Sequence, residues 1–338
     1  MRAVKELDMT ILLVGLGSMG KRRLRLLTQH FSDVNVVGVD QNENRRNEVS
    51  EQFGIITRSS IQEALALRSY EYAFICTAPL SHASLIKLCL SEGMHVFSEL
   101  NLVSDGYIDN MQLAEKKKKT LFLSSTFLYR YETRFIIEHI QNAKSRHNYT
   151  YHVGQYLPDW HPWESYKDFF VSDIRTNGCR EIFAIELPWL LKAFGKVSDI
   201  YVIKGTMSGL SLQYPDNYLV TLSHESGHRG QLIIDVVTRV PVRHFEVFGE
   251  QYQIEWRGEP EKLWIADESF SEMKIVELKG CATRVEGYRE FITEDAYLEE
   301  IKDFFLICEG KKSSIYGFAE DLYTIELMDR IEGIKNNI

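Results

Sequence analysis

The chain has 338 residues, of which 44% are hydrophobic, so it is long enough for two domains with buried cores. Its net charge of −9 argues against a nucleic-acid binder, because such proteins usually carry a basic excess. No window approaches the ~20 apolar residues of a transmembrane helix, and the first residues lack the pattern of a signal peptide. Five cysteines without CxxC or zinc spacing suit a reducing compartment. We therefore expect a cytoplasmic protein with no metal site and no membrane or nucleic-acid partner.

Strands and helices alternate in the first part of the chain. In order, the pattern predicts a strand at 10–14, a helix at 19–29, a strand at 34–39, helices at 43–53 and 60–67, a strand at 72–76, a helix at 81–91, a strand at 95–98, a further helix, and a strand at 121–124. Such alternation predicts βαβ units and a parallel sheet covered on both faces. We expect this domain to span residues 1–125.

A glycine motif lies between the first strand and the first helix. Residues 15–20 read GLGSMG, which is GxGxxG in the required strand–helix context. The first glycine permits the tight turn, the second lets the backbone approach a pyrophosphate, and the third lets the helix pack on the strand. The motif predicts a dinucleotide site. Its expected contributors are Gly15, Gly17, Ser18, Met19 and Gly20.

An acid at the end of the second strand bears on the choice of cofactor. Asp40 follows the motif by about 20 residues, where a carboxylate binds the adenosine ribose hydroxyls. Because it would repel a 2′-phosphate, NAD is favoured over NADP, although the nearby Arg45 and Arg46 weaken this preference. The alternative is a Rossmann-like domain that has lost its nucleotide.

Three segments together resemble a known enzyme family. They are residues 15–20 with Asp40, residues 76–82 (CTAPLSH) and residues 92–99 (EGMHVFSE). In order and spacing they are similar to the glucose–fructose oxidoreductase/inositol dehydrogenase/MocA (Gfo/Idh/MocA) family. The resemblance implies a Rossmann domain followed by an α+β domain on a large, mostly antiparallel sheet that often forms the oligomer interface. It also implies oxidation or reduction of sugars, cyclitols or nucleotide sugars with NAD(P).

The resemblance also implies further cofactor contacts. Thr77, Ala78 and Pro79 would line the cofactor, His82 would begin the next helix beside it, and Glu99 with Leu100 would lie near the nicotinamide ribose. The alternative for Pro79 and His82 is a turn and a helix start with no ligand role.

Two departures from the family concern proton transfer. The family's Glu-Lys-Pro is Glu99-Leu100-Asn101 here, and leucine cannot do acid–base work. In the helix expected at 178–195, the family has an aspartate, a histidine four residues later, and often another acid. Our alignment places Glu181, Ile185 and Pro188 at these positions. The usual lysine and histidine are thus replaced, or the alignment slips.

Replacement residues are sought on the same helix and just before it. Arg180 could hold a carboxylate or phosphate, or form only an ion pair, and Glu181 could transfer a proton. His161 could act as a general acid within a segment, 152–166, that is neither a plain strand nor a plain helix. The expected substrate contacts are Tyr156, Trp160, Trp163 and, after the sixth strand, Arg130. The alternatives are an aromatic loop packed on the core or on a partner subunit, and an Arg130 that anchors the domain junction.

The rest of the chain predicts a second domain at 126–338. Strands are expected at 200–204, 218–223, 231–237, 244–249, 252–256 and 263–265, followed by helices at 297–308 and 318–334. Strands in succession favour an antiparallel sheet. The closing helix 318–334 could pack back on the first domain.

Three functions remain open. The first is an NAD(P)-dependent oxidoreductase of a sugar, cyclitol or nucleotide sugar, working as a homo-oligomer (dimer or tetramer). The second is a reductase of an imine or conjugated substrate, resembling biliverdin reductase. The third is a non-catalytic sensor or scaffold that binds a dinucleotide and a sugar.

Overall fold

The computed structural model describes residues 9–161, 164–267, 272–278, 283–284 and 293–334. Trp163, one of the expected substrate contacts, lies outside these residues. The chain divides into two compact units. The first comprises Met1–Ser124 with Leu298–Leu322, and the second Ser125–Tyr297 with Tyr323–Ile338.

The first unit is built on a six-stranded parallel sheet with the strand order β3-β2-β1-β4-β5-β6. Its strands are β1 (Met9–Val14), β2 (Val34–Val39), β3 (Ile56–Arg58), β4 (Tyr72–Ile75), β5 (His95–Ser98) and β6 (Leu121–Leu123). Its helices are α1 (Ser18–His30), α2 (Glu43–Phe53), α3 (Ile61–Leu65), α4 (His82–Ser91) and α5 (Tyr107–Lys117). The strand order reverses between β1 and β4, which places the ends of both strands at the switch point where such sheets bind ligands.

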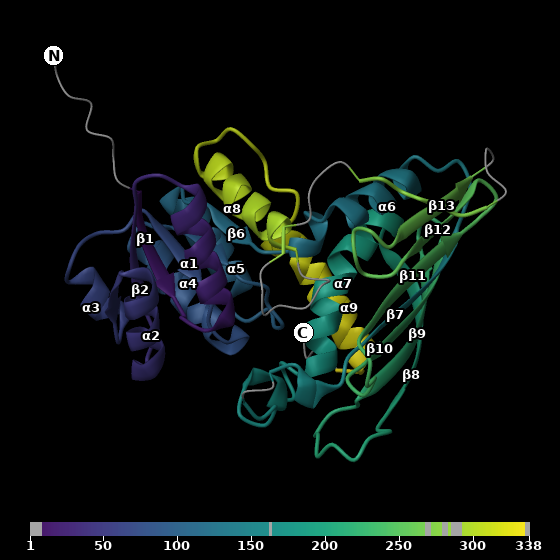
Figure 1. Cartoon of the computed structure of the whole chain (residues 1–338), viewed down its shortest axis with the longest axis horizontal. Helices are drawn as coiled ribbons and strands as arrows, with labels where there is room; N and C mark the ends of the chain where they lie inside the picture. Colours follow the sequence, from purple (N-terminus) through teal and green to yellow (C-terminus); the bar gives the residue numbers. More distant parts are fainter. Residues whose placement is uncertain (1–8, 162–163, 268–271, 279–282, 285–292, 335–338) are drawn as a thin grey trace. The chain divides into compact units, whose positions relative to one another are not determined.

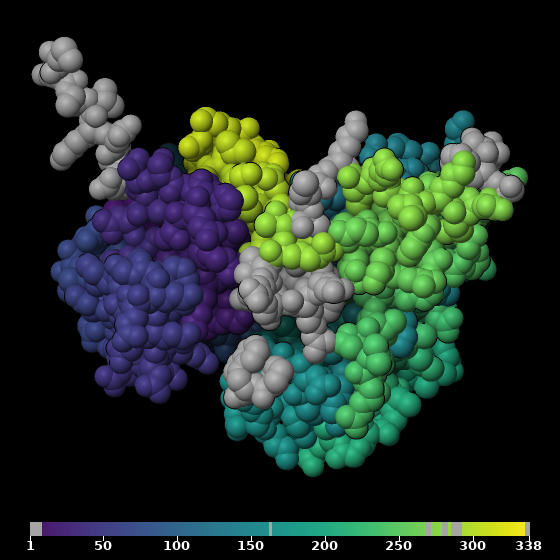
Figure 2. Space-filling model, in the orientation of Figure 1, coloured from purple at the N-terminus to yellow at the C-terminus, as the bar shows by residue number. Residues whose placement is uncertain are grey.

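A late segment of the chain completes the core of this unit. Most of α8 (Glu294–Cys308) belongs to the first unit, and its Phe304 ring packs edge-on against Phe74, Phe97 and Phe122 of β4, β5 and β6 at centroid distances of 5.5, 5.6 and 5.8 Å. Phe305 contacts Phe31 beyond α1, and Figure 2 shows α8 lying against the N-terminal segment. The parallel sheet therefore needs residues from both ends of the chain to bury its face.

The second unit is built on an eight-stranded sheet with the order β14-β13-β12-β11-β7-β10-β9-β8. Its strands are β7 (Asn148–Gly154), β8 (Val197–Gly205), β9 (Asn217–His224), β10 (Arg229–Asp235), β11 (Val242–Phe248), β12 (Tyr252–Trp256), β13 (Leu263–Asp267) and β14 (Lys274–Ile275). Only β7 and β10 pair in parallel. Helices α6 (Tyr131–Gln141) and α7 (Gly178–Phe194) cover one face, as Figure 1 shows. The last helix is α9 (Phe318–Glu332).

The expected fold class, a parallel Rossmann sheet followed by a mostly antiparallel sheet, is confirmed. The central strand β7 was not expected, and its last residues, His152 to Gly154, fall in the segment predicted to be neither a plain strand nor a plain helix. Its period of two is present in the sequence, because Tyr149, Tyr151 and Val153 are buried while the residues between them are not. Among the described residues, no helix has the length and apolarity needed to cross a membrane.

Candidate functional site

The glycine loop is packed so tightly that two of its glycines tolerate no side chain. Gly15 has φ +94°, and a Cβ on it would lie 2.5 Å from the Cys76 carbonyl oxygen. A Cβ on Gly20 would lie 1.9 Å from the carbonyl oxygen of Gly15. The first and third glycines therefore close the turn and seat α1 against β1, as the motif predicts.

The middle glycine faces open space instead. A Cβ on Gly17 would approach nothing closer than Arg45 Nη1, at 3.8 Å. Gly17 precedes α1, whose first residue, Ser18, is exposed, and Met19 is half-buried. The free amides of this helix end and the open backbone at Gly17 fit a pyrophosphate. The loop therefore retains the shape that a dinucleotide requires.

Asp40 is fixed beside this loop. Its Oδ2 accepts a hydrogen bond from the Leu16 amide and its Oδ1 from the Asn42 amide, both at 2.8 Å. Each carboxylate oxygen keeps a lone pair for a further donor. The expected role of Asp40 toward the ribose hydroxyls is thus compatible with its position.

The segment after β4 is held in place by a buried histidine, His82. His82 Nε2 lies 2.9 Å from the Thr77 carbonyl oxygen, and its Nδ1 lies 2.6 Å from the Asn101 side chain. Burial lowers the pKa of His82, which favours the neutral ring with a single N–H. A ring that donates to Thr77 holds the backbone of the segment Thr77–Ser81, where Ala78 is exposed and Pro79 starts a short 3₁₀ turn. His82 thus holds the segment that is expected to line the cofactor, and its own side chain is only 2% exposed.

Glu99 belongs to a buried charge cluster. Its Oε1 pairs with Arg23 Nε at 2.6 Å, and Arg23 Nη2 pairs with Glu300 of α8 at 2.7 Å and donates to Ser124 Oγ at 3.1 Å. Burial raises the pKa of Glu300 despite the neighbouring guanidinium. The adjacent Leu100 is half-buried and carries no proton-transfer group. Arg23 therefore fixes the Glu99 carboxylate, a role that the sequence analysis did not assign.

On α7, the two neighbouring candidates for a catalytic role, Arg180 and Glu181, have different environments. Arg180 is buried, and its guanidinium pairs with Glu332 and, at 2.6 Å, with Asp329, both on α9. This is the ion-pair alternative considered for Arg180, although it is buried rather than on the surface. The contact ties α7 to α9 within the second unit.

Glu181 has no such partner. The residue is half-buried, but its Oε2 is fully buried and makes no hydrogen bond within the described residues. Burial raises the pKa of Glu181 to about 7. Ile185, one turn later, shares the half-exposed face of α7, whereas Pro188 is buried inside the helix. Glu181 is therefore the one titratable group among the three aligned positions, with a pKa suited to exchange protons near neutrality.

The aromatic loop before α7 reaches the start of this helix. Trp160 donates from Nε1 to the Gln155 carbonyl at 3.1 Å, and its Cη2 would lie 3.5 Å from a Cβ on Gly178. His161 Nδ1 lies 2.9 Å from Glu164 Oε1. The ring of Tyr156 is covered by the Arg239 guanidinium at 3.7 Å from its centroid.

The same loop borders an open pocket of about 340 Å³. It is lined by Tyr166, Lys167, Ser172, Asp173, Ile174, Ser211, Leu212 and Gln213. The next residue, Tyr214, is buried, and its hydroxyl accepts a hydrogen bond from the Gly178 amide at the start of α7, at 3.4 Å. The pocket thus lies next to a residue that contacts the first turn of α7, and its volume is within the ~300–1,000 Å³ usual for small-molecule sites.

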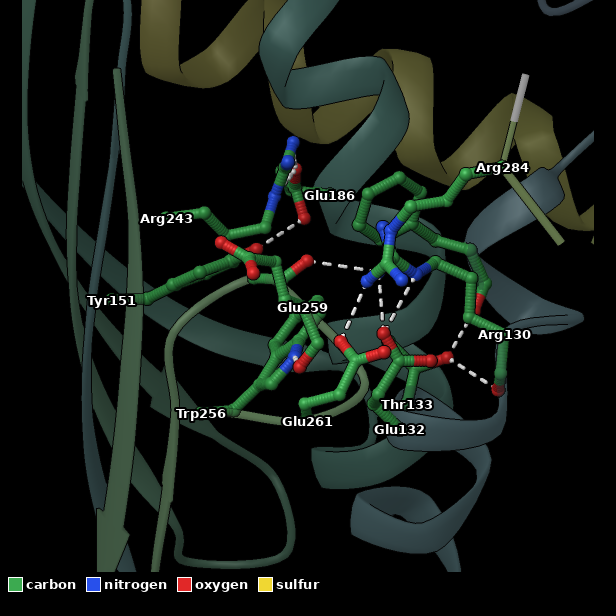
Figure 3. Close-up of polar contacts among 12 residues, drawn as sticks. Arg130, Glu132, Thr133, Tyr151, Glu186, Arg243, Trp256, Glu259, Glu261 and Arg284 are labelled. Atoms are coloured by element: carbon green, nitrogen blue, oxygen red, sulfur yellow. Dashed lines mark hydrogen bonds and ion pairs between the residues drawn. The ribbon is translucent and has the colours of Figure 1, made fainter. Parts of the chain in front are cut away.

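Arg130 is held inside the second unit (Figure 3). Its guanidinium pairs with Glu132, donates to the Gly258 carbonyl at 2.9 Å, and lies 5.2 Å from the ring centroid of Trp256. These contacts join the start of α6 to the turn after β12. Arg130 is only 4% exposed, so its observed contacts are those of an anchor within this unit.

Some contributors carry no recognisable local pattern. Their partners lie at least 19 positions away in the sequence. Arg23 pairs with Glu300, Asn101 hydrogen-bonds to His82, and Arg239 covers the ring of Tyr156. A signal was present only for Asn101, since it interrupts the family's Glu-Lys-Pro.

Residues 9–125 match the model of the GFO_IDH_MocA family, an oxidoreductase family with an NAD-binding Rossmann fold. Over these residues the chain is similar to this family. The Gfo/Idh/MocA resemblance drawn from residues 15–99 is therefore confirmed, and with it the expectation of an NAD(P)-dependent oxidoreductase. No curated protein matches the chain.

Solved structures share the fold over nearly the whole length. Levoglucosan dehydrogenase in complex with NADH and levoglucosan is 17% identical, with TM-score 0.77 and 96% of each chain covered. Biliverdin reductase from Synechocystis sp. PCC 6803, in complex with biliverdin and NADP+, is 16% identical, with TM-score 0.74 and coverage of 96% of this chain and 98% of that one. UDP-N-acetylglucosamine 3-dehydrogenase GnnA from Acidithiobacillus ferrooxidans is 14% identical, with TM-score 0.73 and 97% of each chain covered. At these identities the likeness shows that both units share the fold of these proteins, and it does not name a substrate.

Proposed function

We propose that this protein is an NADH-preferring oxidoreductase of a sugar, cyclitol or nucleotide sugar, with Glu181 as the group that transfers the proton. The observation that carries the proposal is the buried, unbonded Oε2 of Glu181, whose pKa is raised to about 7 by burial. It lies on the helix where the family keeps its acid–base residues. A bound nicotinamide would supply the hydride, which is the part of the chemistry that the protein cannot perform.

The chain's own residues would divide the remaining work. The open backbone at Gly17 and the carboxylate of Asp40 would hold the dinucleotide, and His82 would keep the backbone of Thr77 in place. Glu181 would give a proton to the alkoxide oxygen that forms on reduction, or take it from the hydroxyl on oxidation. Arg180 would act only by fixing α7 against α9.

Substrate recognition is proposed for the loop and pocket beside α7. Tyr166 offers a ring face, while Ser172, Ser211 and Gln213 offer hydroxyl and amide groups. This mixture of one aromatic ring with several hydrogen-bonding groups suits a hydroxylated ring. Tyr156, Trp160 and His161 precede Tyr166 in the same loop, and we retain them as candidate contacts.

A panel assay tests the function directly. Sugars, cyclitols, nucleotide sugars, cyclic imines and a linear tetrapyrrole would be incubated with the protein and NADH or NAD, and the change in NADH followed. We expect turnover in the first three classes. Turnover only of the imine or tetrapyrrole would replace the proposal by the second enzyme hypothesis, and NADH binding without turnover of any class would favour the sensor.

The exposed sheet face predicts a homo-oligomer. Ile203 of β8 pairs in register with Leu219 of β9, which pairs with Ile233 of β10, and Tyr201 lies beside them. Ile203 and Tyr201 are 54% and 66% exposed. No helix of the described residues of this unit covers that face (Figure 1). Apolar groups gathered in this way usually mark an interface.

We expect light scattering to give twice or four times the chain mass of 39.3 kDa. Changing both Ile203 and Leu219 to glutamate should shift the mass to that of one chain, because like charges and desolvated carboxylates oppose association. The matched control is Ile108→Glu on α5 of the first unit, because Ile108 is as exposed as Ile203 but lies outside this sheet. A wild-type protein of one-chain mass would contradict this prediction.

A further inference from the structure

Three arginines lie near the end of β2, and two of them donate to backbone carbonyls. Arg46 Nη1 donates to the carbonyls of Asp40 and Gln41, both at 2.9 Å, and Arg58 Nη1 donates to the Thr57 carbonyl at 2.7 Å. Hydrogen bonds from Ser59 lower the pKa of Glu63, and the charges of Arg58 and Arg46 lower it further. Both guanidinium groups therefore stabilise nearby backbone carbonyls and interact with the Glu63 carboxylate.

Arg45 has a different environment. It stands in the first turn of α2, where its backbone amide is capped by Asn42. Its Nη1 lies 3.9 Å from Asp40 Oδ2 and 3.8 Å from the position of a Cβ on Gly17. The side chain is 47% exposed, and its guanidinium makes no hydrogen bond within the described residues. This guanidinium is thus placed between the ribose-binding acid and the open part of the glycine loop.

Asp40 cannot move away to admit a phosphate. The amides of Leu16 and Asn42 hold its two oxygens, and its side chain is only 11% exposed. A 2′-phosphate on the adenosine ribose would bring its negative charge close to this carboxylate. Such a ligand binds only if a cation at the same place offsets the repulsion, and a guanidinium can do so with two parallel hydrogen bonds.

We propose that Arg45 allows this site to bind NADPH as well as NADH, by binding the 2′-phosphate while Asp40 binds the ribose of NADH. Arg46 and Arg58 take no part. The inference rests on the proposed function only in requiring that the glycine loop bind a dinucleotide. It makes Arg45 a specificity-determining residue and Asp40 the source of the remaining preference for NADH.

The test is a set of titrations with NADH and NADPH, followed by energy transfer from tryptophan to the nicotinamide. Wild type, Arg45→Gln, Arg45→Lys and the charge-matched control Arg58→Gln would be compared at low and moderate salt. Loss of a charge-assisted hydrogen-bond pair should weaken NADPH binding by about tenfold or more in Arg45→Gln. NADH binding should change by less than about threefold, because the ribose contact does not use the guanidinium.

The other outcomes are distinct. Arg45→Lys should retain part of the NADPH affinity at low salt and lose it at moderate salt. Arg58→Gln should leave the affinities for NADH and NADPH unchanged. Equal loss for both nucleotides in Arg45→Gln, or a wild-type chain that binds NADH but not NADPH, would overturn the inference. If the wild-type chain bound neither nucleotide, the proposed function itself would fail.

Discussion

Replacing Glu181 by glutamine is expected to lower turnover by ~10²- to 10⁴-fold, the usual contribution of general acid–base catalysis. Glutamine keeps the size and the hydrogen-bonding atoms of the side chain but cannot exchange a proton. The affinity for NADH should stay within about twofold, since Glu181 belongs to the second unit and the glycine loop to the first. Steady-state kinetics on the best substrate of the panel, together with an NADH titration, would check both parts.

The pH profile separates catalysis from a structural role. Because burial raises the pKa of Glu181 to about 7, the side chain is mostly protonated below that pH and ionised above it. Reduction needs the acid form, so its rate should fall as pH rises through about 7, and oxidation should show the opposite slope. The variant should lose this inflection.

The matched control is Glu138→Gln on the exposed face of α6, which should leave rate and profile unchanged. An unaltered turnover number in Glu181→Gln would remove Glu181 from the mechanism. A variant that is slow but keeps the inflection would assign the titration to another group.

Alanine at Gly20 should act mainly on folding, and alanine at Gly17 mainly on cofactor binding. A Cβ at Gly20 would lie 1.9 Å from the Gly15 carbonyl oxygen, so helix and loop must separate, at a cost of ~1–3 kcal/mol or more in the free energy of unfolding. Gly17 has φ −74° and open space around its Cα. Its alanine variant should fold normally, yet the methyl group would occupy the place expected for the pyrophosphate.

Denaturant unfolding and NADH titration distinguish the two glycines. We expect Gly20→Ala to lower the unfolding midpoint, and Gly17→Ala to keep the midpoint and weaken NADH binding by about tenfold or more. Gly54→Ala is a useful reference, because that glycine has φ +67° but no neighbour within 4 Å, so it reports backbone strain alone. Full NADH affinity in Gly17→Ala would contradict the assigned pyrophosphate contact.

The sequence by itself determined the first sheet, the glycine loop and the likeness to an oxidoreductase family. These features depend on local patterns: strands of apolar residues, helices at period 3.6, and glycines whose spacing is fixed by one turn. It also located Glu181, through its position on the helix at 178–195. The position of β7 was missed, because prolines and aromatic residues directly after it obscured its alternation.

Only the tertiary structure decided what the candidate residues do. Arg180 meets Asp329 and Glu332, and Arg23 joins Glu99 to Glu300, through contacts that span most of the chain. No local pattern specifies which carboxylate a given arginine will meet after folding. The raised pKa of Glu181 has the same origin, since burial by distant segments, and the lack of a partner among the described residues, set it rather than the residue type.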